Sequence, residues 1–302
     1  AEARTRPRLV SAVATPPLEH MATKHIFVTG GNAGIGFALC KLLVGEREDT
    51  FVFLGSRDAE KGAAAVKSIS DAYPAAADRI ALVAIDVGDE ASVAAAAAVL
   101  QAKSVPLYAL VNNAGVGFQT SPGDAAALLN VNLLGPKRVS EAILPLIDPA
   151  AGRIVNVSSG AASMWLRSQS AATKELFTSR SATWEQLAAA VEELAPAASM
   201  GGYGLSKAAL TAYTLQQAAA HPNLTITSLS PGYIKTAMTA GSGARLTPEQ
   251  GTVSMMRCLF GEVTSGYYYG SDALRSPMTV TRDPGTPEYG GEENPDAATY
   301  NR

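Results

Sequence analysis

The chain has 302 residues, of which 47% are hydrophobic and 17% charged, so it can bury a large core and is not disordered as a whole. Its formal net charge is −3 and it has no dense run of lysine and arginine, which argues against a nucleic-acid partner. The richest apolar run, Ala91–Leu100, is too short to cross a bilayer, so no membrane span is expected.

Residues 1–22 precede the first regular pattern in the chain. They contain three arginines and a proline pair but lack the apolar segment of a secretory signal. We interpret them as a disordered N-terminal extension, with Met21 as a candidate start. If they are an expression leader, we expect a cytoplasmic protein. If they are the remnant of a transit peptide, we expect an organelle such as the plastid.

From His25 onward, predicted strands and helices alternate. The first unit is a strand at 26–28, a glycine turn and a helix at 35–44. Further strands are predicted at 51–54, 80–85, 107–111, 154–157, 224–229 and 266–269, and helices at 59–72, 90–102, 125–144, 203–219 and 248–260.

Continuous apolar runs such as Ile80–Ile85 are typical of parallel strands that are covered on both faces. The sequence therefore predicts an α/β fold: a single Rossmann-type domain over residues 23–270, with a doubly wound parallel sheet of about seven strands and helices on both faces.

Two segments do not fit this alternation. The first is an insertion at about 160–202, where Thr183 and Gln186 form a capping-box pattern ahead of apolar residues at helical spacing. We predict an extra helix there. The second is the tail at 271–302, which is rich in proline, glycine and glutamate and is predicted to be irregular.

The cysteines and histidines suggest no metal site and no disulfide. Cys40 and Cys258 lie in apolar patterns typical of helices, with no second cysteine nearby. The histidines, His20, His25 and His221, are scattered along the chain. We interpret all three as structural or exposed residues.

A glycine turn follows the first strand. Gly30, Gly34 and Gly36 lie where a tight turn meets the start of a helix, and glycine there lets a pyrophosphate approach the helix N-terminus. A dinucleotide is the natural ligand of such a turn, although an ordinary glycine turn would share the pattern.

Tyr203 and Lys207 are four residues apart on a predicted helix, so their side chains share one face. A neighbouring ammonium group would lower the pKa of the tyrosine and make its phenol a usable proton donor. Taken alone, such a pair is more often an ordinary surface pair, and only the other motifs in their order favour the catalytic interpretation.

Several motifs in one order resemble the short-chain dehydrogenase/reductase family. They span residues 25–240 and are Thr29-Gly30-x3-Gly34-Ile35-Gly36, Asn112-Asn113-Ala114-Gly115, Asn132, Ser159, Tyr203-x3-Lys207 and Pro231-Gly232. Ser159 and Tyr203 are 44 positions apart, a longer interval than in most of the family. This insertion resembles the monomeric carbonyl reductase branch.

The resemblance implies four catalytic residues. Tyr203 would donate the proton, Ser159 would hold the carbonyl oxygen, Asn132 would hold a water molecule, and Lys207 would bind the nicotinamide ribose. Ser158 and Asn130 are neighbours that compete for two of these roles, and the family register selects Ser159 and Asn132.

The end of the second strand bears on which nicotinamide cofactor binds. Arg57 follows this strand and favours the 2′-phosphate of NADPH, whereas Asp58 would suit NAD unless it only caps the next helix. Ala33 stands where NADPH reductases of the family often carry a second cation. The full set of cofactor-binding residues that the resemblance implies is Gly30, Asn32, Gly34, Ile35, Gly36, Arg57, Asp86, Val87, Asn113, Ala114, Gly115, Tyr203, Lys207, Pro231, Gly232, Ile234 and Thr236.

The resemblance implies an NADPH-dependent carbonyl reductase that acts on a small lipophilic ketone or aldehyde. The alternatives are an alcohol dehydrogenase that works oxidatively and an inactive relative that binds NADPH in a regulatory role. We also expect a monomer, because the insertion would cover the helical face through which family members pair. A lid over the substrate is the alternative role of that insertion.

Overall fold

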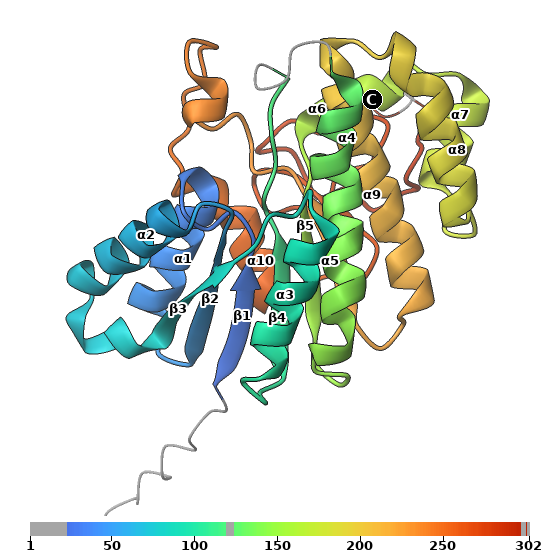
Figure 1. Ribbon diagram of the computed structural model, residues 1–302. Coiled ribbons are helices and arrows are strands. Elements are labelled where there is room, and N and C mark those ends of the chain that lie inside the picture. Colours follow the sequence, from blue (N-terminus) through green and yellow to red (C-terminus); the bar gives the residue numbers. More distant parts are fainter. Residues whose placement is uncertain (1–22, 119–123, 297–299, 301–302) are drawn as a thin grey trace, which may run out of the picture.

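The computed structural model describes residues 23–118, 124–296 and 300. The predicted extension at 1–22, and the localisation that depends on it, lie outside the described residues. Within them, the strands form one parallel sheet in the order β3-β2-β1-β4-β5-β6-β7, as Figure 1 shows for its labelled strands. The strands are Lys24–Val28 (β1), Thr50–Ser56 (β2), Ile80–Ala84 (β3), Leu107–Asn112 (β4), Arg153–Val157 (β5), Thr225–Leu229 (β6) and Tyr268–Tyr269 (β7).

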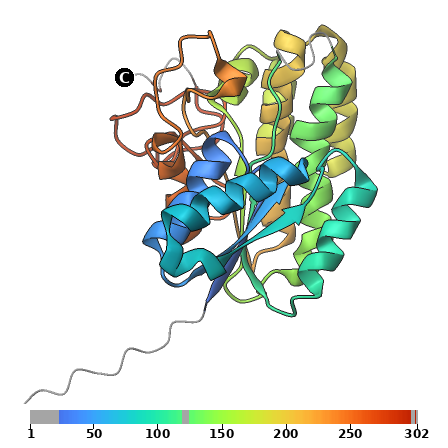
Figure 2. The ribbon, with the colours of Figure 1, turned by 60° about the vertical axis from the view of Figure 1, so that its left-hand side comes forward.

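Helices cover both faces of this sheet (Figures 1 and 2). One layer contains α1, α2 and α10, and the other contains α3, α5 and α9. The predicted doubly wound α/β fold is therefore confirmed. The α-helices of the described residues are Gly34–Glu46 (α1), Ala59–Ala72 (α2), Glu90–Gln101 (α3), Ala125–Leu129 (α4), Gly135–Ile143 (α5), Gly160–Arg167 (α6), Ala171–Thr178 (α7), Trp184–Leu194 (α8), Tyr203–Ala220 (α9) and Val253–Phe260 (α10).

The continuous apolar strands are explained by burial on both faces. Ile26 and Val28 of β1 belong to the core cluster that includes Leu39 of α1, whereas Phe27 belongs to the cluster that includes Val93 of α3. Successive side chains of a strand point to opposite faces, so both faces of β1 must be apolar. Cys40 of α1 and Cys258 of α10 both lie in the first of these clusters and are buried, free thiols.

The helix predicted at 125–144 is interrupted. Residues Asn130–Leu134 form a π-helical turn between α4 and α5. Asn132 in this turn exchanges two hydrogen bonds of 2.9 Å with the backbone of Val116, and Asn130 donates to the carbonyl of Gly88 at 3.0 Å. These side-chain hydrogen bonds to other segments stabilise the π-helical turn. The spacing of apolar residues along the chain gives no sign of them, so the interruption was not predicted.

The insertion folds as three helices rather than the one predicted. Helix α8 begins at the predicted capping box, where Thr183 and Gln186 bond reciprocally. Helices α6 and α7 were not predicted. All three pack on α9 in a third core cluster that contains Phe177, Leu187 and Leu205. As a result, 14 of the 18 residues of α9 are buried.

Residues 271–296 contain no helix and no strand, but they are held to the body of the protein. Arg275 pairs with Glu293 at 3.0 Å, and Arg282 pairs with Asp272. Met278 between them is buried in the cluster of α9. In the described part of the chain, no helix has both the length and the apolar character for a transmembrane segment, and no cluster of histidine, cysteine and carboxylate side chains could ligate a metal.

Candidate active site

The turn after β1 lies against the end of β4. Gly30 has φ of +66°, and a Cβ on it would lie 2.9 Å from Cα of Ala114. The hydroxyl of Thr29 accepts hydrogen bonds from the backbone N–H groups of Asn113 and Ala114 at 3.0 and 3.1 Å. Two motifs that are distant in the sequence therefore form one rigid floor.

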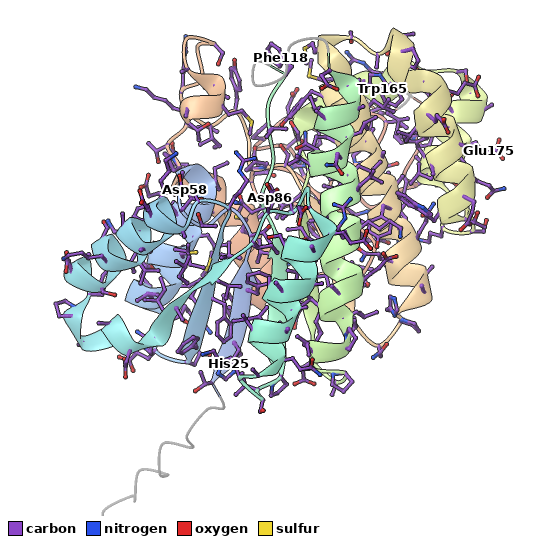
Figure 3. The ribbon with its side chains drawn as sticks, viewed as in Figure 1. His25, Asp58, Asp86, Phe118, Trp165 and Glu175 are labelled. Atoms are coloured by element: carbon purple, nitrogen blue, oxygen red, sulfur yellow. The ribbon has the colours of Figure 1, made fainter. Side chains whose placement is uncertain are left out.

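A cavity of about 370 Å³ opens above this floor, at the carboxyl ends of the strands. Figure 3 shows Asp86 and Phe118 at this end of the molecule and His25 at the opposite end. Residues that follow six consecutive strands of the sheet line the cavity, namely Gly30, Arg57, Asp86, Asn113, Ser158 and Pro231. Ligands of doubly wound sheets bind at this position, where the strand order reverses.

Most of the predicted site residues come together here. Those that line the cavity are Gly30, Asn32, Gly34, Ile35, Arg57, Asp86, Val87, Asn113, Ala114, Gly115, Tyr203, Lys207, Pro231 and Thr236. The other five predicted residues are not among those that line the cavity, namely Gly36, Asn132, Ser159, Gly232 and Ile234.

The end of β2 presents a cation to the cavity. The side chain of Arg57 is 71% exposed, and its Nε lies 3.8 Å from a carboxylate oxygen of Asp86. Asp58 accepts a hydrogen bond of 3.0 Å from the N–H of Lys61 and is the N-cap of α2. Asp58 thus caps α2, and of the two residues only Arg57 lines the cavity.

The two adjacent serines after β5 have different surroundings. Ser158 is buried, and its hydroxyl donates to the carbonyl of Lys207 at 2.9 Å and contacts Thr211 at 2.7 Å. The hydroxyl of Ser159 caps α6 by accepting from Ala161 at 3.2 Å, and it is also hydrogen-bonded to Tyr203. Ser158 therefore holds α9 in place, whereas Ser159 is paired with the phenol.

Tyr203 is the first residue of α9 and is partly exposed to the cavity. Removal from water raises the pKa of its phenol, and the hydrogen bond to Ser159 acts in the opposite direction. The sequence predicted a lowered pKa from the nearby ammonium of Lys207, and that direction is wrong in this structure. The reason is that desolvation of the phenolate dominates.

Lys207 is one turn further along α9 and only 5% exposed. Its Nζ donates to the carbonyl of Val157 at 2.9 Å, and burial lowers its pKa to about 8. A Cβ on Gly115 would lie 3.5 Å from this Nζ and 3.1 Å from Oδ1 of Asn132. Because Gly115 has no side chain, Nζ of Lys207 and Oδ1 of Asn132 both border the same space beside it.

Sequence reasoning missed part of the cavity wall. The additional lining residues are Ala33, Ile85, Val116, Val131, Val157, Ser158, Ala237 and Met238. Most are apolar neighbours of the predicted residues. Met238 is different, because it lies on the loop after β6 and its side chain packs over Gly117 on the loop after β4. Only the folded chain brings these two loops together.

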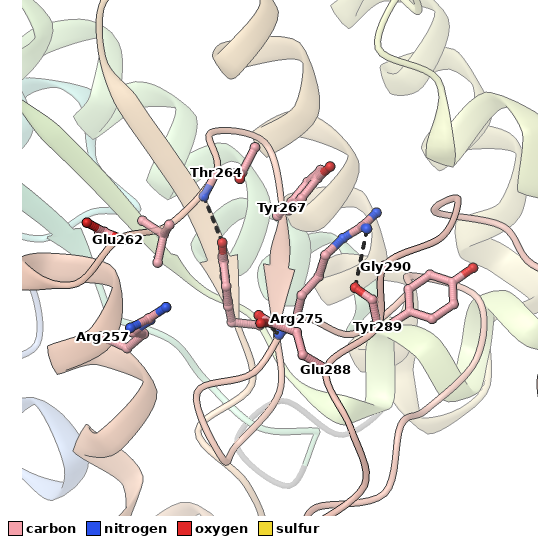
Figure 4. Close-up of a pocket in the computed structure, with 10 residues that line it drawn as sticks. Arg257, Glu262, Thr264, Tyr267, Arg275, Glu288, Tyr289 and Gly290 are labelled. Atoms are coloured by element: carbon pink, nitrogen blue, oxygen red, sulfur yellow. Dashed lines mark hydrogen bonds between the residues drawn. The ribbon is translucent and has the colours of Figure 1, made fainter.

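A second cavity, of about 490 Å³, lies beside β7 (Figure 4). Its lining includes Arg257, Tyr267, Arg275 and Tyr289 and none of the predicted site residues. The guanidinium of Arg275 stacks 3.7 Å from the centre of the Tyr267 ring and pairs with Glu293. These contacts fasten the C-terminal segment to the sheet.

Comparison with known proteins shows similarity to dehydrogenases and reductases of one family. Residues 24–183 match the family model of the short chain dehydrogenases. The chain is 29% identical to a (+)-neomenthol dehydrogenase of Arabidopsis thaliana over 78% of this chain and 90% of the relative. It is 30% identical to human carbonyl reductase [NADPH] 1 over 74% of this chain and 86% of the relative.

Solved structures show the same architecture. Salutaridine reductase from Papaver somniferum superimposes with a TM-score of 0.71 at 28% sequence identity. The alignment covers 82% of this chain and 99% of that reductase. The structural similarity therefore covers most of the chain and not only the sheet with the glycine turn.

Proposed function

The chain belongs to the short-chain dehydrogenase family, and from that premise we propose that it is an NADPH-dependent carbonyl reductase of small lipophilic ketones or aldehydes. It is an oxidoreductase close to the carbonyl reductase branch of the family. The observation that carries the proposal is the meeting of Tyr203, Ser159 and Lys207 beside a cavity floored by glycine.

The residues of the cavity fit a dinucleotide phosphate. The N-cap of α1, Ala33, makes no side-chain capping bond, and the first turn carries no acidic residue. The first N–H groups of α1 are therefore available to an anion at the positive end of the helix. A Cβ on Gly30 would collide with Ala114, so glycine lets the turn before α1 pack closely on the residues that follow β4.

Arg57 supports NADPH over NADH. Its guanidinium lies at the rim of the cavity and can form charge-assisted hydrogen bonds to a 2′-phosphate. Asp58, the residue that would favour a free ribose hydroxyl, is committed to capping α2. Human carbonyl reductase [NADPH] 1, a relative at 30% identity, bears the same cofactor in its name.

When bound, NADPH supplies the hydride that reaches the carbonyl carbon. Negative charge then develops on the carbonyl oxygen, and the hydroxyl of Ser159 donates a hydrogen bond to it. Tyr203 donates its proton to the same oxygen. Burial keeps the Tyr203 phenol protonated until that moment, which suits a proton donor.

Lys207 and Asn132 complete the proton path. Both reach the point beside Gly115, where a water molecule can connect the Lys207 ammonium to the cavity. Asn132 is held there by two hydrogen bonds to Val116 in the π-helical turn. After Tyr203 has given up its proton, this path returns one from solvent.

The insertion supports a monomer. Helix α8 contacts α9 through Trp184 and Tyr213, whose rings meet edge to face at 5.6 Å, and contacts α5 through Lys137 over the Trp184 ring. Helices α5 and α9 thus have a partner within the chain, which removes the apolar face that would drive association.

The function is tested by following loss of reduced-nicotinamide absorbance with a panel of ketones, quinones and terpenoids. NADPH and NADH are run in parallel, and the oxidative direction is assayed with NADP+ and the corresponding alcohols. We expect ketone-dependent oxidation of NADPH that exceeds that of NADH. No ketone-dependent oxidation of either nucleotide would contradict the proposal.

A further inference from the structure

One buried hydroxyl lies between the two loops that border the cavity. Ser230 follows β6 directly, is 8% exposed, and donates its backbone N–H to the carbonyl of Tyr269 at 2.9 Å. Its Oγ accepts one hydrogen bond from the N–H of Gly160 at 3.0 Å and another from the N–H of Gly232 at 3.3 Å. Both lone pairs of this oxygen are therefore used.

The two N–H groups belong to two different loops, one next to the proposed substrate-binding residue and one next to the cofactor. Gly160 is the residue after Ser159, which holds the carbonyl oxygen in the proposed mechanism. Gly232 lies in the turn after Pro231, a residue of the cavity wall, and the same loop continues to Thr236. The hydroxyl of Ser230 thus ties the loop that carries the substrate-binding serine to the loop that borders the cofactor.

The hydrogen atom of this hydroxyl also has a partner. Tyr268 of β7 is 3% exposed, and its phenol is hydrogen-bonded to Ser230 and to Ser163 of α6. Tyr268 is therefore a neighbour that can take the Ser230 hydrogen while the lone pairs of Oγ accept from Gly160 and Gly232. Residues of β7 and α6 thus surround the oxygen that follows β6.

We propose that Ser230 is a positioning residue that sets the spacing between Ser159 and the Pro231–Gly232 turn, with Tyr268 as the group that orients it. The proposal rests on the proposed carbonyl reductase function. Hydride transfer depends steeply on the distance between donor and acceptor, so a small change in this spacing slows the chemical step. The binding of NADPH through Arg57, at the other end of the cavity, is untouched.

Ser228 supplies a matched control. It lies two residues before Ser230, inside β6, and is 1% exposed. Its Oγ has no hydrogen-bond partner. Ser228→Ala therefore removes a buried hydroxyl close to Ser230 in the sequence without breaking a link between the two loops.

We expect Ser230→Ala to lower kcat about 10- to 100-fold while the KM for NADPH changes less than about threefold. The deuterium isotope effect on kcat, measured with NADPH labelled at the transferred position, should rise because hydride transfer becomes rate-limiting. Ser230→Thr keeps the hydroxyl and should recover most of kcat, and Ser228→Ala should match the parent protein in both quantities. A wild-type kcat and isotope effect in folded Ser230→Ala would overturn the proposal.

A second measurement does not depend on activity. Amide hydrogen exchange should become faster at Gly160 and Gly232 in Ser230→Ala and remain unchanged in Ser228→Ala. If the parent protein reduces no ketone, the proposed function fails, and this exchange pattern still shows whether Ser230 links the two loops. Unchanged exchange at both glycines would overturn the link itself.

Discussion

Replacing Lys207 with methionine should stabilise the protein while abolishing its activity. Lys207 is buried, and its pKa falls from 10.5 to about 8. One unit of pKa corresponds to about 1.4 kcal/mol, so keeping this ammonium charged in the folded protein costs about 3 kcal/mol at neutral pH. Methionine has a similar length and carries no charge. It forfeits the hydrogen bond from Nζ to the carbonyl of Val157, worth about 1 kcal/mol, so we expect a net gain of about 2 kcal/mol in the free energy of unfolding.

The pH dependence of stability provides a second signature of Lys207. Its folded-state pKa of about 8 is below the unfolded value of 10.5, so between these limits the unfolded chain binds more protons. The contribution of Lys207 to the free energy of unfolding should therefore rise as pH increases from about 8 toward 10. Below pH 8 the full cost of burying the charge is present. Lys207→Met lacks this contribution, so the signature is a stability difference between the variant and the parent protein that changes with pH.

Urea unfolding at pH 7 and at pH 10, followed by circular dichroism, measures both effects. The stability difference between Lys207→Met and the parent protein should be about 2 kcal/mol at pH 7 and should shrink at pH 10. Lys207→Met that is less stable than the parent protein at pH 7 would refute the reasoning, because Lys207 would then stabilise the fold rather than serve the site at a cost to it.

Three other predictions concern the cofactor, the insertion and the assembly. Arg57→Asp should lower the ratio of kcat/KM for NADPH over NADH about 100-fold, because it replaces a charge-assisted contact with repulsion. Lys61→Asp, the same charge change outside the cavity lining, should leave this ratio unaltered, and an equal loss in both variants would exclude a specific role for Arg57. Phe177→Ala should lower the free energy of unfolding by about 3 to 5 kcal/mol in urea titrations, because Phe177 is fully buried under α9, and a loss below about 1 kcal/mol would show that the insertion packs loosely. Analytical ultracentrifugation at micromolar concentration should give a monomer of 31.1 kDa, and a stable dimer would contradict the covering of α5 and α9 by the insertion.

The fold could be predicted because burial on both faces leaves a strong signal in the sequence. In β1, Ile26, Phe27 and Val28 are all apolar and all buried, and the strand is followed by a helix with its own spacing. Helices α6 and α7 could not be predicted in the same way. Each has eight residues, and α7 buries only Phe177 among them, so too few positions repeat for a pattern to be recognised. Their place on α9 is decided by packing in the folded chain.

The candidate site could be predicted as a set of residues but not as an electrostatic environment. The order of the motifs brought together the glycine turn, Arg57, Tyr203 and Lys207, and the structure gathers these around one cavity. Whether the pKa of Tyr203 is raised or lowered depends on how far the fold removes the phenol from water. The four-residue spacing between Tyr203 and Lys207 gives no information about this burial. The link through Ser230 likewise depends on bonds between residues about 70 positions apart.

The central claim is that Tyr203 donates the proton in an NADPH-dependent carbonyl reduction, and Tyr203→Phe tests it most directly. The variant keeps the ring of Tyr203 and loses only the hydroxyl that is bonded to Ser159. Ketone-dependent NADPH oxidation should be measured for the parent protein and the variant with the same substrate, together with NADPH affinity by fluorescence titration. We predict that kcat falls about 10²- to 10⁴-fold with NADPH affinity unchanged. A variant that retains most of the parent kcat would contradict the claim.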